Sequence, residues 1–176
     1  MSFKQIVQIM RGILPFVLLL SMLSGCASVS TNALELIGQP APEARLMMLE
    51  GGDIAIRAKD GRTKILLFWA TWCPYSRGAI EDFEELAREY ANRRDLSFYA
   101  VSVDNNQDIA ELLGRISEQD LRVVQHVFSG NDIQDEVFLS LRGKTIPYAA
   151  VIDKSGFVRF LDIGVSGLDD YLATLD

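Results

Sequence analysis

Residues 65–77 read ILLFWATWCPYSR and decide the fold. The first six of them, residues 65–70, are a continuous apolar run of strand length, which is typical of a strand buried on both faces. Pro74 then stands at a position that suits the first turn of a helix. Apolar residues recur at spacings of three and four up to about residue 92, which predicts an amphipathic helix. The stretch therefore predicts a buried strand that turns directly into a helix, with Cys73 at the junction.

Strand and helix patterns alternate along the rest of the chain. Before the central strand, residues 45–49 and 54–58 flank Glu-Gly-Gly-Asp, which predicts a β-hairpin. Further strands are expected at 96–103, 123–128, 148–152 and 157–163, and further helices at 109–116, 132–141 and 167–175. This order predicts an α/β fold with a central mixed β-sheet flanked by helices and an N-terminal β-hairpin.

The first 25 residues differ in kind from the rest. Residues 12–23 are an apolar run that is too short to cross a bilayer as a helix, which takes about 20 residues. The run ends in Leu-Ser-Gly-Cys, which resembles the lipobox of bacterial lipoproteins. We expect a signal peptide at 1–25, a lipidated Cys26 with a tether at 26–36, and a folded domain at 37–176. An uncleaved membrane anchor is the alternative.

Charge and cysteine content limit the partners. Removal of residues 1–25 takes away two positive charges, so the net charge moves from −7 to −9, and nucleic acid is a poor partner. We expect the protein in the bacterial cell envelope, held to the membrane by lipid on Cys26 and facing the periplasm. Ala27, where lipoproteins of the inner membrane often have aspartate, favours the outer membrane. With Cys26 acylated, Cys73 is the remaining thiol and no internal disulfide can form.

Two motifs carry a family resemblance. WATWCPYSR at 69–77 and KTIPYAAVIDKSGFV at 144–158, in this order, resemble the thioredoxin fold, specifically its periplasmic TlpA/ResA-like (redoxin) branch. IGQPAPEARL at 37–46 and FYAVSVDNNQDIAELL at 98–113 resemble the same branch, so the likeness covers about residues 37–176.

The resemblance implies a thiol–disulfide site. It makes Ile146–Pro147 a cis-proline peptide beside the active-site Cys73, and it makes Cys73, Ser76 and Pro147 the catalytic positions. The substrate groove would be lined by Trp72, Pro74, Tyr75 and Ile146. The start of a helix favours an anion, so the Cys73 thiolate should be stabilised.

Ser76 departs from the dithiol pattern, CxxS standing in place of CxxC. In a dithiol relative, the first cysteine attacks a substrate disulfide and the second breaks the mixed disulfide. A hydroxyl cannot do the second step, although it could donate a hydrogen bond to the Cys73 thiolate. Leu67 also stands where many thioredoxins have a buried acid, so the strand offers no general base.

Three functions fit these residues. The first is a monothiol oxidoreductase that forms mixed disulfides with exported proteins bearing thiols or disulfides and is released by an external reductant. The second is a redox-inactive binding module whose groove beside Pro147 holds an extended peptide. The third is a thiol peroxidase, which the sequence supports poorly because Leu66 and Ala70 replace the proline and threonine of peroxiredoxin sites.

The remaining candidates have simpler explanations. His126 is a lone histidine without partner ligands in the sequence, so we expect neither a metal nor a cofactor. Trp69 and Trp72 are expected to shelter one side of the site, Trp69 as a core residue, and Tyr75 to point outward. The acidic residues of the first helix are expected to form a solvated face: Glu81, Asp82, Glu84 and Glu85.

Overall fold

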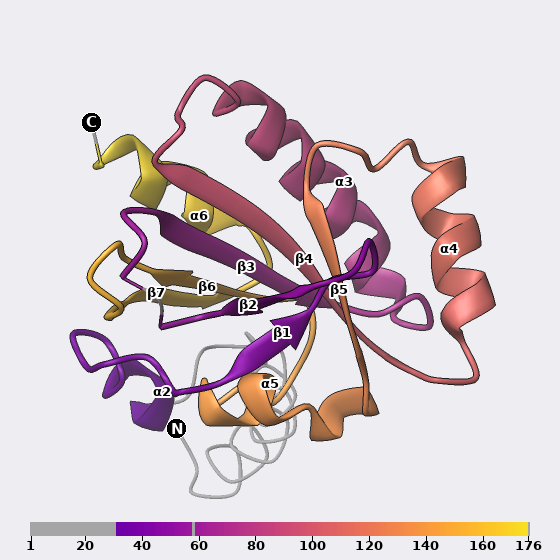
Figure 1. Cartoon of the computed structure of the whole chain (residues 1–176), viewed down its shortest axis with the longest axis horizontal. Helices are drawn as coiled ribbons and strands as arrows, with labels where there is room; N and C mark the ends of the chain where they lie inside the picture. The colour runs from indigo at the N-terminus through magenta and orange to yellow at the C-terminus, as the bar shows by residue number, and fades with distance from the viewer. Residues whose placement is uncertain (1–30, 58, 176) are drawn as a thin grey trace, which may run out of the picture.

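The computed structural model describes residues 31–57 and 59–175. A five-stranded sheet forms the centre, in the order β5-β4-β3-β6-β7 (Figure 1). Its strands are β3 (Thr63–Trp69), β4 (Leu96–Asn105), β5 (Gln125–Gly130), β6 (Tyr148–Ile152) and β7 (Val158–Ile163). β3, β4 and β5 run parallel, while β6 and β7 are antiparallel to their neighbours, which confirms the predicted mixed sheet.

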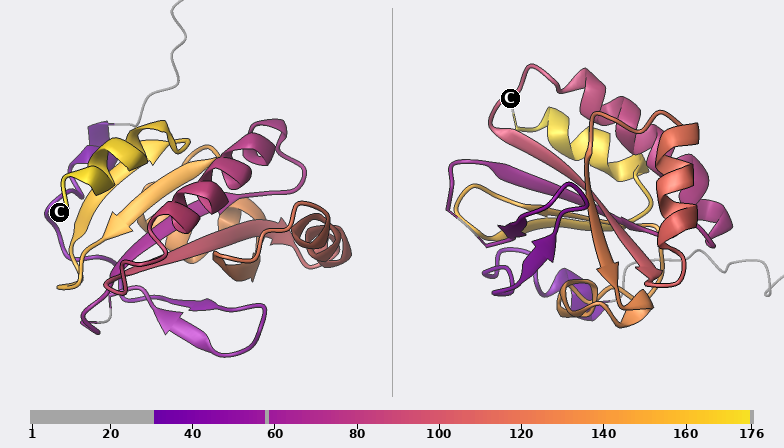
Figure 2. Two further views of the ribbon diagram at one scale, coloured as in Figure 1. Left: turned by 90° about the horizontal axis from the view of Figure 1, so that it is seen from above. Right: turned by 45° about the vertical axis from the view of Figure 1, so that its right-hand side comes forward.

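Helices cover both faces of the sheet (Figures 1 and 2). α3 (Pro74–Glu89), α4 (Ile109–Glu118) and α6 (Ser166–Ala173) contribute side chains to the core on one face. α2 (Thr31–Leu34) and α5 (Glu136–Ser140) contribute to the core on the other face. The predicted helix at 132–141 is divided into a short 3₁₀ helix η1 (Asp132–Gln134) and α5, because Asp135 caps α5 by accepting a hydrogen bond from the Phe138 N–H.

β3 supplies side chains to both cores. Ile65, Leu67 and Trp69 pack toward α3 and α6, whereas Leu66 and Phe68 pack toward α5. All five side chains are at most 1% exposed. The apolar run therefore predicted this strand correctly, since a strand with helices on both faces has no side open to water.

The predicted N-terminal hairpin is present but short. β1 (Arg45–Met47) pairs with β2 (Asp53–Ala55) in an antiparallel ladder. The segment after β1 reaches the edge of the main sheet, where the Leu49 N–H donates to the His126 carbonyl at 2.9 Å. The hairpin thus covers part of the β5 edge, which would otherwise be open to pairing with another chain.

The folded domain begins earlier than residue 37. Ala33 in α2 is 1% exposed within the core, and the Gly38 N–H donates to the Val158 carbonyl of β7 at 2.7 Å. Ala33 and Leu36, which were predicted to belong to the tether, are therefore packed on the domain. The signal peptide, Cys26 and the rest of the tether lie outside the described residues. None of the described helices combines the length and hydropathy needed to cross a membrane.

Glu84 corrects the expected solvated face of α3. Its side chain is 3% exposed, and its carboxylate accepts hydrogen bonds from the N–H groups of residues 122, 123 and 124 at 2.9, 2.7 and 3.1 Å. Arg88 lies one turn along the helix at 3.5 Å. Glu84 therefore ties α3 to the loop that precedes β5, while Glu81, Asp82 and Glu85 are exposed as predicted.

We predict that Glu84→Gln lowers the free energy of unfolding by about 1–3 kcal/mol. The amide replaces one acceptor oxygen with a donor that faces backbone N–H groups, so at least one bond is lost in a buried place. Urea unfolding at neutral pH measures the change. Glu85→Gln, on the exposed side of the same helix, is the matched control and should change stability by less than about 0.5 kcal/mol. Equal effects of the two variants would contradict this role of Glu84.

His126 is half-buried beside the same loop. Its Nε2 lies 2.8 Å from the Leu121 carbonyl oxygen, which can only accept, so Nε2 carries the proton. Burial lowers the pKa of His126 below its ordinary value of about 6.5, although the Leu121 carbonyl and the carboxylates of Glu84 and Glu50 act in the opposite direction. The unfolded chain therefore takes up this proton more readily than the folded one.

We predict that this histidine makes the protein less stable as the pH is lowered from about 7 to about 5. Because the pKa of His126 is lower in the folded chain than in the unfolded chain, the protein keeps its full stability at pH values above the unfolded-state pKa. It loses stability as the pH falls from there toward the folded-state pKa. His126→Gln keeps an N–H donor without titrating, so its unfolding free energy should fall less over this range. Urea unfolding at several pH values measures both slopes, and identical slopes would refute the assignment.

Candidate functional site

The central strand turns into α3 through Thr71 and Trp72, and Cys73 occupies the N-cap position of the helix. Its backbone is extended, with φ −88° and ψ 115°, and its N–H donates to the Ala70 carbonyl at 3.2 Å. Pro74 is the first helical residue, as predicted, where its missing N–H costs no hydrogen bond. The turn places the Cys73 side chain at the carboxyl end of β3, beside the start of a helix.

The Cys73 thiol faces the loop before β6. Ile146–Pro147 is a cis peptide, as the resemblance predicted, and the Cys73 Sγ lies 3.6 Å from the Ile146 carbonyl oxygen, to which it donates. Cys73 is 7% exposed and belongs to the core cluster that also holds Ile146 and Phe68. The two sequence motifs therefore meet at one point, at a cysteine that is almost entirely buried.

Ser76 lies one turn into α3 and is fully buried. Its N–H donates to the Cys73 carbonyl at 3.1 Å, and its Oγ accepts from the Ala70 N–H at 3.4 Å. Within the described residues, no hydrogen bond joins the Ser76 Oγ to the Cys73 Sγ. The expected bond from Ser76 to the sulfur is thus not made in this structure, because the sulfur turns to Ile146 and the hydroxyl turns to the backbone of the preceding turn.

The aromatic residues of the motif separate into buried and exposed ones. Trp72 is 50% exposed and Tyr75 is 82% exposed, so both border the site from the solvent side, and Pro74 between them is exposed as well. Trp69 is 1% exposed in the core between the sheet and α3, opposite to the cluster that holds Cys73. Its core position was predicted correctly, but it does not shelter the thiol. Nothing in the described structure pairs with its buried Nε1.

The loop that carries the cis peptide is anchored on α5. The Arg142 and Gly143 N–H groups donate to the carbonyls of Leu139 and Phe138, both at 2.9 Å, which closes the helix in a Schellman motif. A Cβ at Gly143 would lie 2.2 Å from the Phe138 ring, so the loop passes directly against that ring. Phe138 in turn packs on Phe68, one position before the end of β3.

Tyr148, which follows the cis peptide, fixes the same loop from the other side. Its hydroxyl donates to the Leu141 carbonyl at 2.9 Å, and its ring lies edge-on to Phe138. Burial, with a smaller contribution from the Asp162 carboxylate, raises the pKa of Tyr148 to about 12. The phenol is therefore neutral at physiological pH and acts as a structural donor.

We predict that Gly143→Ala lowers the free energy of unfolding by about 1–3 kcal/mol, because the added methyl group overlaps the Phe138 ring in a packed core. Chemical denaturation measures the change. Gly114→Ala is the matched control: Gly114 lies within α4 with no atom within 4 Å of an added Cβ. Since alanine suits a helix better than glycine, the control should gain about 0.5–1 kcal/mol. A neutral Gly143→Ala would show that the loop does not need this close contact.

Asp104 was missed by the sequence analysis. It lies near the end of β4, is fully buried, and accepts hydrogen bonds from Thr71, in the turn before Cys73. The sequence contains one signal for it, since an aspartate continues an apolar strand at the edge of the sheet where parallel strands end. Thr71 is 33 residues away along the chain, so no local pattern could identify this contact.

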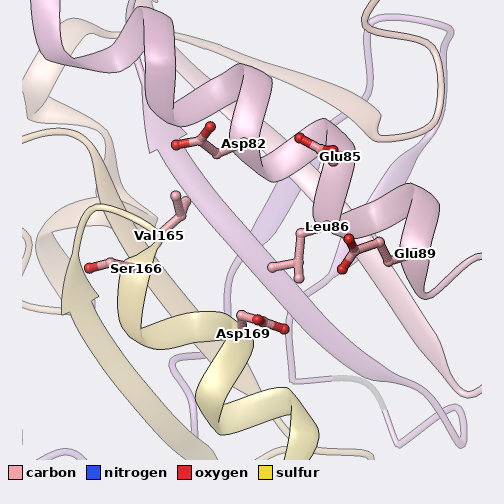
Figure 3. A pocket seen from close by; sticks show the side chains of 7 residues that line it. All are labelled: Asp82, Glu85, Leu86, Glu89, Val165, Ser166 and Asp169. Atoms are coloured by element: carbon pink, nitrogen blue, oxygen red, sulfur yellow. The ribbon is translucent and has the colours of Figure 1, made fainter.

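A concave region lies between α3 and α6, with a volume of about 230 Å³. Figure 3 shows Asp82, Glu85 and Glu89 projecting from α3 and Asp169 from α6. Cys73 is not among its lining residues. Among residues 31–57 and 59–175, no three histidine, cysteine or acidic side chains are placed to hold a metal ion together. The groove is thus an acidic surface separate from the thiol.

Comparisons with known proteins agree with this geometry. A model of the AhpC/TSA family matches residues 37–161. The chain is 25% identical over 134 residues to the thioredoxin-like protein YneN of Bacillus subtilis, which covers 72% of this chain and 71% of YneN. It is 27% identical over 136 residues to sporulation thiol-disulfide oxidoreductase A of the same organism, with coverages of 72% and 74%.

Solved structures resemble the whole domain. A thiol-disulfide oxidoreductase from Bacteroides fragilis superposes with a TM-score of 0.68 at 22% identity, covering 78% of this chain and all of the other. StoA from Bacillus subtilis superposes with a TM-score of 0.60 at 25% identity, covering 76% and 99%. The fold is therefore the thioredoxin-like fold of thiol-disulfide oxidoreductases.

Proposed function

The chain belongs to the AhpC/TSA family, and from that premise we propose that it exchanges disulfides through Cys73 as a monothiol. The supporting observation is that the Cys73 Sγ lies 3.6 Å from the carbonyl of the cis Ile146–Pro147 peptide, while a buried serine occupies the position of a second thiol. Capture of a partner is chemically possible at such a site, and release requires a thiol from elsewhere.

The exchange has two steps, each of which conserves the number of disulfides. In the first, the Cys73 thiolate attacks one sulfur of a partner disulfide, a mixed disulfide forms, and the partner's other sulfur leaves as a thiolate. In the second, the thiolate of an external reductant, or a second thiol of the partner, attacks the mixed disulfide and Cys73 leaves as a thiolate. Ser76 takes part in neither step, because an alkoxide does not form at neutral pH and an S–O bond would not persist.

The exposed residues next to Cys73 in the chain are suited to an extended protein segment. Trp72, Pro74 and Tyr75 present apolar surface there, and the buried Ile146 faces the thiol with its carbonyl. The partners would be exported proteins with thiols or disulfides, met in the bacterial cell envelope. Lipid on Cys26 would hold the domain at the periplasmic side of a membrane, and Ala27 favours the outer one.

A redox-inactive binding module is the second candidate. It is favoured by the small exposure of Cys73, 7%, and by the engagement of the Ser76 hydroxyl with the turn instead of with the sulfur. In that case the surface beside Pro147 would bind an extended peptide through backbone hydrogen bonds, and the thiol would be a packed core residue. A peroxidase has less support, since Leu66 and Ala70 are buried apolar side chains.

Trapping in cells distinguishes the two candidates. Cells that express the full chain are quenched with acid, free thiols are blocked, and the protein is examined on a non-reducing gel. We expect discrete bands of higher mass that disappear with dithiothreitol and with Cys73→Ala. Mass spectrometry of these bands would identify the partners. If Cys73 is recovered entirely as a free thiol, the monothiol mechanism is wrong and the binding module is favoured.

Ser76→Cys is the complementary variant. A thiol at this position, one helical turn from Cys73, can attack the mixed disulfide from within the chain and form an internal disulfide. The trapped bands should therefore fall by about tenfold or more, while the internal disulfide appears. Ser76→Ala is the control for loss of the hydroxyl and should keep the bands. If the bands persist unchanged in Ser76→Cys, release does not depend on the missing thiol.

A further inference from the structure

Asp104 is a buried carboxylate directly behind the turn that carries Cys73. It is fully buried near the carboxyl end of β4, next to β3 in the sheet. The register pairs Trp69 with Ser102, so Asp104 lies level with the residues that follow β3. Parallel neighbours thus bring its side chain to the end of the strand from which the active-site turn begins.

The carboxylate is fully engaged by donors from two segments. Its Oδ1 accepts from the Thr71 N–H at 3.0 Å and from the Thr71 Oγ1 at 2.7 Å. Its Oδ2 accepts from the Ser102 Oγ at 2.7 Å and lies 3.2 Å from the Thr71 N. Thr71 therefore donates through both its backbone and its side chain to a single buried group.

No ion pair to Asp104 exists among residues 31–57 and 59–175. A buried polar side chain is costly and persists where hydrogen bonds compensate for the lost water. An apolar side chain would fill the same space more cheaply. Only a carboxylate, however, offers acceptors on two oxygens at once, one for Thr71 and one for Ser102. The hydrogen bonds to Thr71 therefore explain a carboxyl group at position 104 better than the need to fill space in the core does.

The turn is held at two consecutive amides. The Ala70 N–H donates to the Ser76 Oγ, and the Thr71 N–H donates to Asp104. The Cys73 N–H then closes the turn on the Ala70 carbonyl at 3.2 Å. The backbone that leads to Cys73 is fixed in this way, and from it the Cys73 side chain points to the carbonyl of the cis peptide.

We infer that Asp104 is a positioning residue for the Cys73 thiol, acting through Thr71. The inference rests on the proposed exchange reaction and extends it: the Asp104–Thr71 contact sets how fast the folded protein attacks a disulfide. Asp104 itself touches neither the sulfur nor a partner. Its contribution is a fixed backbone for Cys73, which helps to place Sγ for an attack that must be in line with the disulfide bond that breaks.

The test uses the full chain with Cys26→Ser, so that Cys73 is its sole thiol. Dithiodipyridine is the probe, because each exchange releases one coloured thione. The second-order rate constant is measured for the folded protein and again in urea, where position no longer matters. Thr71→Val retains the shape and the N–H but removes the hydroxyl donor, and Asp104→Asn removes one acceptor. Each should lower the folded-state rate constant by about fivefold or more and leave the urea value unchanged.

Two controls separate positioning from general stability. Thr71→Ser keeps both donors and should stay within about twofold of the wild-type rate constant. Glu84→Gln removes another buried carboxylate that holds backbone amides, in the later part of α3 and away from Cys73. It should lower the melting temperature and leave the rate constant unchanged. If Thr71→Val and Asp104→Asn react at the wild-type rate, or if Glu84→Gln slows the reaction equally, Asp104 does not position the thiol. If the folded wild-type protein reacts no faster than it does in urea, the proposed exchange reaction fails, and this inference fails with it.

Discussion

The pairing of β3 with β6 is the constraint on which the site depends. β3 is buried on both faces, and Phe68 stands opposite Tyr148 in the antiparallel ladder. A slip of one residue would exchange the two cores and move every side chain of β3 to the wrong face, so the register is strongly fixed. Since the active-site turn leaves β3 just after Trp69 and the cis peptide enters β6 just before Tyr148, the register alone brings Cys73 and Ile146 together across 73 residues of sequence.

The sequence predicted those features that depend on local pattern. The apolar run of β3, Pro74 at the start of α3 and the alternation of strands and helices each depend on a few neighbouring residues. For Glu84 two signals disagreed. Helical spacing places it on the face of Ile80 and Ala87, which are both buried, whereas its charge suggested exposure, and the prediction followed the charge. The pattern was sufficient there, and the assumption that a charged residue is solvated was wrong.

The contact of Asp104 and the packing of Ala33 and Leu36 were not predicted from the sequence, for a different reason. The contact of Asp104 with Thr71 joins β4 to the turn after β3, and the packing of Ala33 depends on the core formed by distant strands, so neither contact follows from neighbouring residues. Ser76 belongs to the same group, since its motif position was evident but the direction of its hydroxyl was not. Its bond to the Ala70 N–H gives this serine a structural use that does not require a second thiol nearby. Serine in place of a second cysteine therefore keeps a hydrogen bond that closes the turn, but it cannot break a mixed disulfide at Cys73.

The shallow exposure of Cys73 also bears on how a captured partner would leave. A mixed disulfide has two sulfurs, and an external thiol must reach one of them in line with the S–S bond. The Cys73 sulfur lies in the core cluster with Ile146, and the bound partner would cover what remains accessible. The partner's own sulfur, outside the protein, is then the more accessible one. Attack there returns Cys73 as a thiolate and leaves the partner's sulfur in a new disulfide with the attacking thiol. When that thiol belongs to the same partner, the partner departs with an internal disulfide, so this geometry suits the rearrangement of disulfides within a partner better than their net reduction.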